Sequence, residues 1–296
     1  MSSGTNSTRT TLSGTVARLS PLALPFVFLF LGGLGLTVAQ SFGWLLPGEF
    51  PGGWLEGYRE ALRPHLLASF GLSLSVALVS AGLSVALGSV AAYVIWKLPE
   101  GLRRGAVVYK VGLILPHAAV AFVILILWSQ SGFLASLGHH LGLVETPGDF
   151  PTILFGGNGL GMVLAYTYKE TPFVILLALA VLLRTDPRLV QTARMFGASE
   201  PVIFRRIILP RLRPVLNTAF IILYLYTFGA FDIPFLLGES SPGMLSIEIY
   251  NLYFNRDLVN RPTAMALLVF MLLFSVVFIV FYTRVARRLE QGERKL

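Results

Sequence analysis

Apolar stretches of roughly 20 residues recur along the whole chain, and they constrain its fold more than any other feature. One soluble core could not hide so many of them, and each is long enough to cross a hydrocarbon layer of about 30 Å. They lie near residues 21–46, 66–96, 107–128, 160–183, 214–238 and 264–284. Only 13% of the residues are charged, against about 25% in ordinary soluble domains. The sequence therefore predicts an all-α integral membrane protein with about six transmembrane helices.

The placement of Lys and Arg between these stretches predicts their orientation. If the N-terminus lies inside, 18 of the 23 basic residues fall on the inner side and four on the outer side, with Lys169 left inside a span. Cytoplasmic loops of membrane proteins carry such an excess. We therefore expect both termini in the cytoplasm. Because the basic residues are explained in this way, the net charge of +8 does not indicate a nucleic-acid partner.

The residue types available also limit the chemistry. The chain has no cysteine, which excludes disulfides, Cys-ligated zinc, iron–sulfur clusters and thiol catalysis. His139 and His140 are adjacent in a predicted external loop without further ligands, so we expect no metal site there. No Ser, His and Glu constellation converges in the spans, which disfavours a membrane enzyme.

The longest cytoplasmic connection, residues 184–213, has the clearest local pattern. Asp186 followed by Pro187 favours a helix start, and Gly197 favours the turn that ends this helix. Ser199 begins a second helix that Pro210 is expected to close. The pattern predicts a helix–turn–helix on the membrane surface.

The second of these helices carries exposed apolar residues in this prediction. Phe204 and Ile207 are three apart and fall on one face, beside Arg205. Three interpretations remain open from these residues alone. The segment contacts anionic lipid, its arginines only set the topology, or it docks a partner protein.

The residue order across this segment resembles the "EAA" loop of ABC-importer permeases, whose pattern is E-A-A-x-x-x-G-A-x-x-x-x-x-F-x-x-I-x-L-P. Gln191 and Thr192 replace the first two pattern residues, so the carboxylate that the pattern places first is missing here. The resemblance extends loosely over residues 65–290. The positions that match without a gap are Ala193, Gly197, Ala198, Phe204, Ile207, Leu209 and Pro210.

This resemblance implies the fold of a type I ABC-importer permease, with the loop acting as the helix that couples it to a cytoplasmic ATPase. The residues implied in coupling are Gln191, Ala193, Gly197, Ala198, Phe204, Arg205, Ile207, Leu209 and Pro210. The implied partners are two ATP-binding cassette subunits, a second identical or homologous permease subunit, an extracytoplasmic binding protein and membrane lipid. The chain has no G-x-x-x-x-G-K-[ST] pattern, so ATP and Mg²⁺ are expected on the partner, and the chain itself is expected to bind no cofactor.

Composition, apolar length and this resemblance together divide the chain into four expected parts, and the resemblance implies a bacterial inner membrane. Residues 1–20 are expected to form a flexible cytoplasmic arm, and residues 21–64 the first transmembrane helix with an external loop. Residues 65–290 form the permease core, which contains the coupling loop 184–213. Residues 291–296 are expected to form a cytoplasmic tail.

Polar residues within the fourth span are candidates for the translocation pathway, because a charge left in hydrocarbon costs several kcal/mol. The candidates are Tyr166, Lys169 and Glu170, and Pro172 is expected to kink their helix. The alternative is structural: Lys169 and Glu170 neutralise each other, or Lys169 bonds to a neighbouring helix.

The fifth span adds Phe231 and Asp232 as pathway candidates. The run from Gly229 to Gly238 resembles that of polyamine-type permeases, and an acidic lining suits a cationic substrate such as spermidine or putrescine. A sugar, sulfate or molybdate, a phosphonate and ferric ion remain open, and Asp232 is equally suited to hydrogen bonding at a helix end.

A rival interpretation needs no ATPase. A secondary transporter or channel could use Lys169, Glu170 and Asp232 as an ion relay, and it would then transport solute in proteoliposomes that contain this chain alone.

Overall fold

The computed structural model describes residues 19–21, 23–46, 53–239, 241–255 and 257–293. Every regular element in these ranges is a helix. Helical segments long and apolar enough to cross a membrane are Leu19–Ser41, Pro64–Lys97, His117–His140, Leu160–Leu182, Glu200–Gly229 and Leu258–Arg288. These observations confirm the predicted all-α fold with six candidate spans. The predicted N-terminal arm and C-terminal tail lie largely outside the described residues.

The chain forms two compact units, of which the smaller comprises residues 1–61 and 252–270. Inside it, the Ser41 hydroxyl lies 2.7 Å from the Tyr58 hydroxyl, and the Phe42 ring packs on the rings of Trp54 and Tyr58. Its described helices are η1 (Val27–Leu31), α2 (Gly32–Ser41), α3 (Glu56–Ala61), most of η5 (Asn251–Asn255), η6 (Leu258–Asn260) and the start of α15 (Arg261–Glu293).

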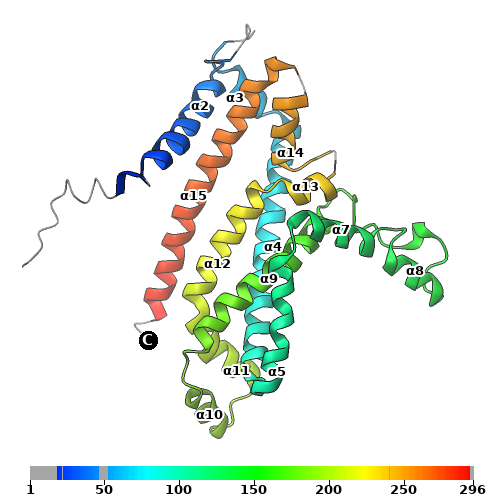
Figure 1. The fold of residues 1–296 in the computed structure, drawn as a ribbon, viewed down its shortest axis with the longest axis vertical. Helices are drawn as coiled ribbons and strands as arrows, with labels where there is room; N and C mark the ends of the chain where they lie inside the picture. Colours follow the sequence, from blue (N-terminus) through cyan, green and yellow to red (C-terminus); the bar gives the residue numbers. More distant parts are fainter. Residues whose placement is uncertain (1–18, 22, 47–52, 240, 256, 294–296) are drawn as a thin grey trace, which may run out of the picture. The chain divides into compact units, whose positions relative to one another are not determined.

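The larger unit comprises residues 62–251 and 271–296. Three of its long helices, α4, α9 and α12, pack against one another, and in Figure 1 α9 lies obliquely to α4. In chain order its helices are α4 (Pro64–Lys97), α5 (Glu100–Gly105), η2 (Ala106–Lys110), α6 (Val111–Ile114), α7 (His117–Trp128), α8 (Phe133–His140), η3 (Pro147–Asp149), α9 (Leu160–Leu182), α10 (Arg188–Met195), α11 (Glu200–Ile203), η4 (Phe204–Ile208), α12 (Leu209–Gly229), α13 (Asp232–Leu237), α14 (Leu245–Tyr250) and the rest of α15.

Small residues allow α4 to lie close to α9. A β-carbon added at Gly88 would lie only 2.6 Å from Cβ of Val174, so the two backbones approach as closely as a glycine permits. Such small-residue faces are how membrane helices gain packing energy without a hydrophobic driving force. The other buried small residues of α4 are Ser69, Ser73, Ala77, Ser80, Ala81, Ser84, Ser89 and Ala92.

The third span differs from its predicted bounds of 107–128. Helix α6 ends at Ile114, and α7 begins only at His117. Pro116 lies at this break as the N-cap of α7, where its missing N–H costs no hydrogen bond. The continuous predicted helix is therefore divided in two, and the apolar span runs on to His140.

The helix expected to close at Pro210 does not end there. Pro210 lies in the first turn of α12, and the helical path runs from Glu200 to Gly229 through the π-helical turn η4. The hydrogen-bond pattern already changes in this wide turn, so the missing N–H of Pro210 does not break the helix.

Candidate functional site

Helix α10 and the turn after it form the centre of the coupling segment, residues 184–213. A carboxylate oxygen of Asp186, the residue before the N-cap Pro187, accepts the backbone N–H of Arg188 at 2.9 Å and so holds the turn that leads into the helix. At the other end, the N–H of Ala198 donates to the carbonyl of Ala193 at 3.0 Å. Gly197 has a φ of +79°, a conformation that L side chains rarely adopt. The predicted turn at Gly197 is confirmed.

The apolar residues exposed at this turn are not those that the sequence pattern emphasises. Met195 and Phe196 are each 87% exposed. Phe204 and Ile207 instead pack against the core of the larger unit and are only partly exposed. The expectation of an anchor exposed at Phe204 and Ile207 is corrected in this respect, because η4 continues into α12 and turns both side chains inward.

The predicted coupling residues fall into two groups by exposure. Those open to a partner are Gln191, Gly197 and Arg205. Those partly buried are Ala193, Ala198, Phe204, Ile207, Leu209 and Pro210. The first group can contact another protein, whereas the second mainly holds the segment on its own subunit. The role of both groups in coupling stays a prediction.

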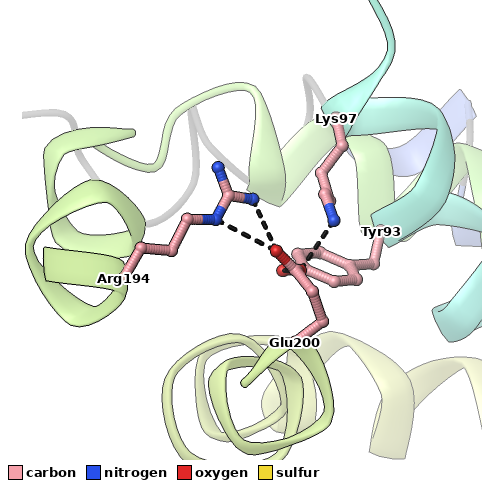
Figure 2. Close-up of polar contacts among 4 residues, drawn as sticks. All are labelled: Tyr93, Lys97, Arg194 and Glu200. Carbon is pink, nitrogen blue, oxygen red and sulfur yellow. Dashed lines mark hydrogen bonds and ion pairs between the residues drawn. The ribbon is translucent and has the colours of Figure 1, made fainter. Parts of the chain in front are cut away.

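A charged cluster that the sequence pattern does not reveal holds this segment to α4. Figure 2 shows Arg194, Lys97 and Tyr93 converging on the carboxylate of Glu200. Oε1 accepts hydrogen bonds from Arg194, whose Nε lies at 3.0 Å and whose terminal nitrogen lies at 2.9 Å. Oε2 lies 2.6 Å from Nζ of Lys97 and accepts the Tyr93 hydroxyl at 2.7 Å. We call these four residues the Glu200 cluster.

Aromatic contacts also hold the Tyr93 side chain of this cluster in place. The Tyr93 ring lies 5.4 Å from the Phe204 ring, measured between centroids, and Nζ of Lys97 lies 5.3 Å from the centre of the Tyr93 ring. Such ring and cation–π contacts orient the side chains they join. A signal for this cluster is present in the sequence only as an i, i+4 pair at the end of α4, Tyr93 and Lys97.

Two of the predicted pathway residues lie inside the larger unit. Tyr166 is 0% and Glu170 is 4% exposed. The carboxylate of Glu170 accepts hydrogen bonds from the hydroxyl of Ser84, at 3.3 Å, and from that of Thr227. These contacts join α4, α9 and α12 at one polar point, so Glu170 has a clear packing role here. Its place on the pathway, and that of Tyr166, stays a prediction.

Lys169 bonds to backbone carbonyls rather than to its neighbour Glu170. Its Nζ donates to the carbonyls of Gly112, Leu113 and Leu115 at 2.9, 3.1 and 2.5 Å. These carbonyls lie where the break between α6 and α7 leaves them without helical partners. The geometry therefore matches the structural alternative in which Lys169 bonds to a neighbouring segment.

Replacing Lys169 with methionine should lower the free energy of unfolding by about 1–3 kcal/mol, the cost of leaving a buried carbonyl unsatisfied. Thermal unfolding in detergent measures this loss of stability. Lys110→Met is the control, because Lys110 is exposed and its replacement should leave the stability unchanged. If the variant unfolds like the parent but transports less solute, the pathway interpretation of Lys169 replaces the structural one.

The remaining pathway candidates lie near the start of α13. Asp232 is exposed and Phe231 is partly exposed. The Phe231 ring lies 5.0 Å from that of Tyr250 and 5.3 Å from that of Phe235, again between centroids. An exposed acidic residue thus follows directly in the chain after a residue whose ring packs in an aromatic group.

Comparison with known proteins identifies the family. Residues 84–291, well over half of the chain, match the family described as binding-protein-dependent transport system inner membrane component. A probable ABC transporter permease protein of Brucella suis is 28% identical over 64% of this chain and 67% of its own length. The trehalose transport system permease protein SugA of Mycobacterium tuberculosis is 28% identical over 70% of this chain and 66% of its own.

A solved structure shows the same fold. A chain in the crystal structure of a bacterial ABC transporter that imports the acidic polysaccharide alginate superposes with a TM-score of 0.75. The two chains are 18% identical, and the superposition covers 93% of this chain and 95% of the other. The protein is therefore a multi-pass permease of the inner membrane rather than an enzyme. The chain belongs to the family of binding-protein-dependent transport system inner membrane components, the permease subunits of ABC importers.

Proposed function

We propose that this chain forms the membrane pathway for a carbohydrate and docks through α10 on a separate ATP-binding cassette subunit. Two such ATPase subunits, a second permease subunit and an extracytoplasmic binding protein complete the importer. The single observation that carries the docking proposal is the exposure of Met195 and Phe196 at the turn after α10. Compact apolar anchors of this kind dominate the binding energy of protein interfaces.

A carbohydrate is favoured over a polyamine by the relatives described above. SugA is named for trehalose, and the superposed importer carries alginate. The surface at the start of α13 suits such a substrate. Aromatic faces such as those of Phe231 and Tyr250 pack against the apolar faces of sugar rings, and the carboxylate of Asp232 accepts hydrogen bonds from sugar hydroxyls.

Affinity purification from the native membrane tests both parts of the proposal. We expect an ATP-binding cassette protein and a binding protein to co-purify with the chain. Thermal shift of the captured binding protein against trehalose, maltose, alginate oligosaccharides, spermidine and putrescine then identifies the substrate class. A shift with polyamines alone overturns the carbohydrate assignment. Uptake into proteoliposomes by this chain without an ATPase would support the rival secondary transporter.

A further inference from the structure

Helix α10 has few connections to the rest of the larger unit that could transmit its movement. The chain joins it to α9 through residues 183–187 and, through the turn at Gly197, to α11, which continues by η4 into α12. A β-carbon added at Gly197 would meet nothing within 4 Å, so open space surrounds this turn. Val190 and Ala193 pack against the core. Neither the turn nor these apolar contacts provides a polar link from α10 to α4.

The carboxylate of Glu200 supplies that link with one oxygen for each helix. Oε1 accepts hydrogen bonds from Arg194 on α10, and Oε2 accepts from Lys97 and Tyr93 on α4 (Figure 2). Each of these groups donates to the carboxylate, and Arg194 and Lys97 have no acceptor of their own. An amide in its place has one acceptor and one donor end. A glutamine at this position can accept hydrogen bonds from the donors of only one helix. Its N–H₂ group then faces the donors of the other helix and cannot accept from them.

The exposure of the cluster indicates positioning rather than stability as its role. The side chains of Lys97, Arg194 and Glu200 are 34%, 45% and 45% exposed. Ion pairs in such surroundings contribute little to the free energy of folding, because water screens them and two long side chains must be ordered. Their geometry nevertheless fixes where α10 lies relative to the end of α4.

We propose that Glu200 is a positioning residue that ties the ATPase-docking helix α10 to α4, so that movement of α10 reaches α4 directly as well as α9 and α12 through the chain. This inference rests on the proposed docking of α10. It assigns to Tyr93, Lys97 and Arg194 the task of holding the Glu200 carboxylate.

The absence of cysteine in the chain makes a direct distance measurement possible. Spin labels are attached to Met195→Cys, at the end of α10, and to Leu87→Cys on α4, both at exposed positions. Their separation is measured by pulsed dipolar spectroscopy on the full chain in nanodiscs. We expect one narrow distance distribution in the parent and a distribution at least twofold wider in Glu200→Gln. The matched control is Glu100→Gln, which removes an exposed pair with Arg104 on α5 and should leave the width unchanged.

Two further variants separate positioning from a general loss of structure. Arg194→Met removes the donor on α10 alone and should widen the distribution as Glu200→Gln does. Glu200→Asp keeps the charge on a shorter side chain and should give an intermediate width. Thermal midpoints should stay within a few degrees of the parent in all three. An unchanged width in both Glu200→Gln and Arg194→Met overturns the proposal.

The reassembled importer provides the functional measurement. In proteoliposomes, Glu200→Gln should raise the number of ATP molecules hydrolysed per solute imported several-fold, while the ATPase still co-purifies. An unchanged ratio would show that α4 receives no motion through Glu200. If no ATPase binds even the parent chain, the proposed function fails, whereas the spin-label experiment still decides whether Glu200 ties α10 to α4.

Discussion

Phe196→Asp should weaken ATPase docking by roughly 30-fold or more while leaving the permease folded. Phe196 is 87% exposed beside the equally exposed Met195, so the change removes no packing within the subunit. In the docked state it would place an unpaired carboxylate in an apolar contact. Loss of a central interface anchor costs about 2 kcal/mol or more, which corresponds to roughly 30-fold weaker binding.

The measurement is the dissociation constant between the purified ATPase and the chain in nanodiscs. Phe196→Leu is the matched control, because it keeps an apolar side chain at the same exposed position and should retain most of the affinity. Phe204→Asp provides a contrast: Phe204 packs on Tyr93, so this change should lower the thermal midpoint of the chain itself. Wild-type affinity in Phe196→Asp would contradict docking through this turn.

Gly88→Leu should prevent normal assembly of the transmembrane helices. A β-carbon at residue 88 already lies 2.6 Å from Cβ and 2.8 Å from a methyl carbon of Val174, and 3.1 Å from the carbonyl oxygen of Thr171. The first two distances are shorter than real β-carbons show, so α4 and α9 would have to separate. Overpacking a tight core lowers the free energy of unfolding by about 1–3 kcal/mol and occasionally more. We expect a leucine side chain between α4 and α9 to reach the upper end of this range.

The same helix offers a control with the opposite expected sign. Gly82 also lies in α4, and a β-carbon there would meet nothing within 4 Å. Replacing a helical glycine with alanine at such a site raises the free energy of unfolding by about 0.5–1 kcal/mol, because glycine loses more backbone freedom on folding. Gly82→Ala should therefore raise the thermal midpoint in detergent, and Gly88→Ala should lower it. Equal shifts for the two variants would rule out close packing at Gly88.

The positions of the spans could be predicted because a membrane demands a minimum apolar length. The fourth span was expected over 160–183 and is observed at Leu160–Leu182. The third was less predictable. Its break depends on Pro116 and on the three carbonyls that Lys169 satisfies from another helix. Nothing near Pro116 in the chain indicates that a lysine more than fifty residues away will compensate for the break.

The coupling segment shows the same division. The turn at Gly197 was predictable, because a local backbone conformation that favours glycine leaves a local signature. The sequence does not predict which of the two phenylalanines in this segment is exposed. Phe196 and Phe204 have the same chemistry, and only the course of η4 into α12 turns the second toward Tyr93.

The membrane class, the number of spans and the segment that resembles a coupling loop can all be predicted from the sequence, since they depend on apolar length, charge placement and residues close together in the chain. The partners of Lys169, Glu170 and Glu200 become visible only once the helices are packed together. Glu200, for example, meets Tyr93 and Lys97 more than one hundred residues earlier. The physical reason is that hydrogen bonds and ion pairs act over about 3 Å, and packing of helices distant in sequence sets which side chains approach that closely.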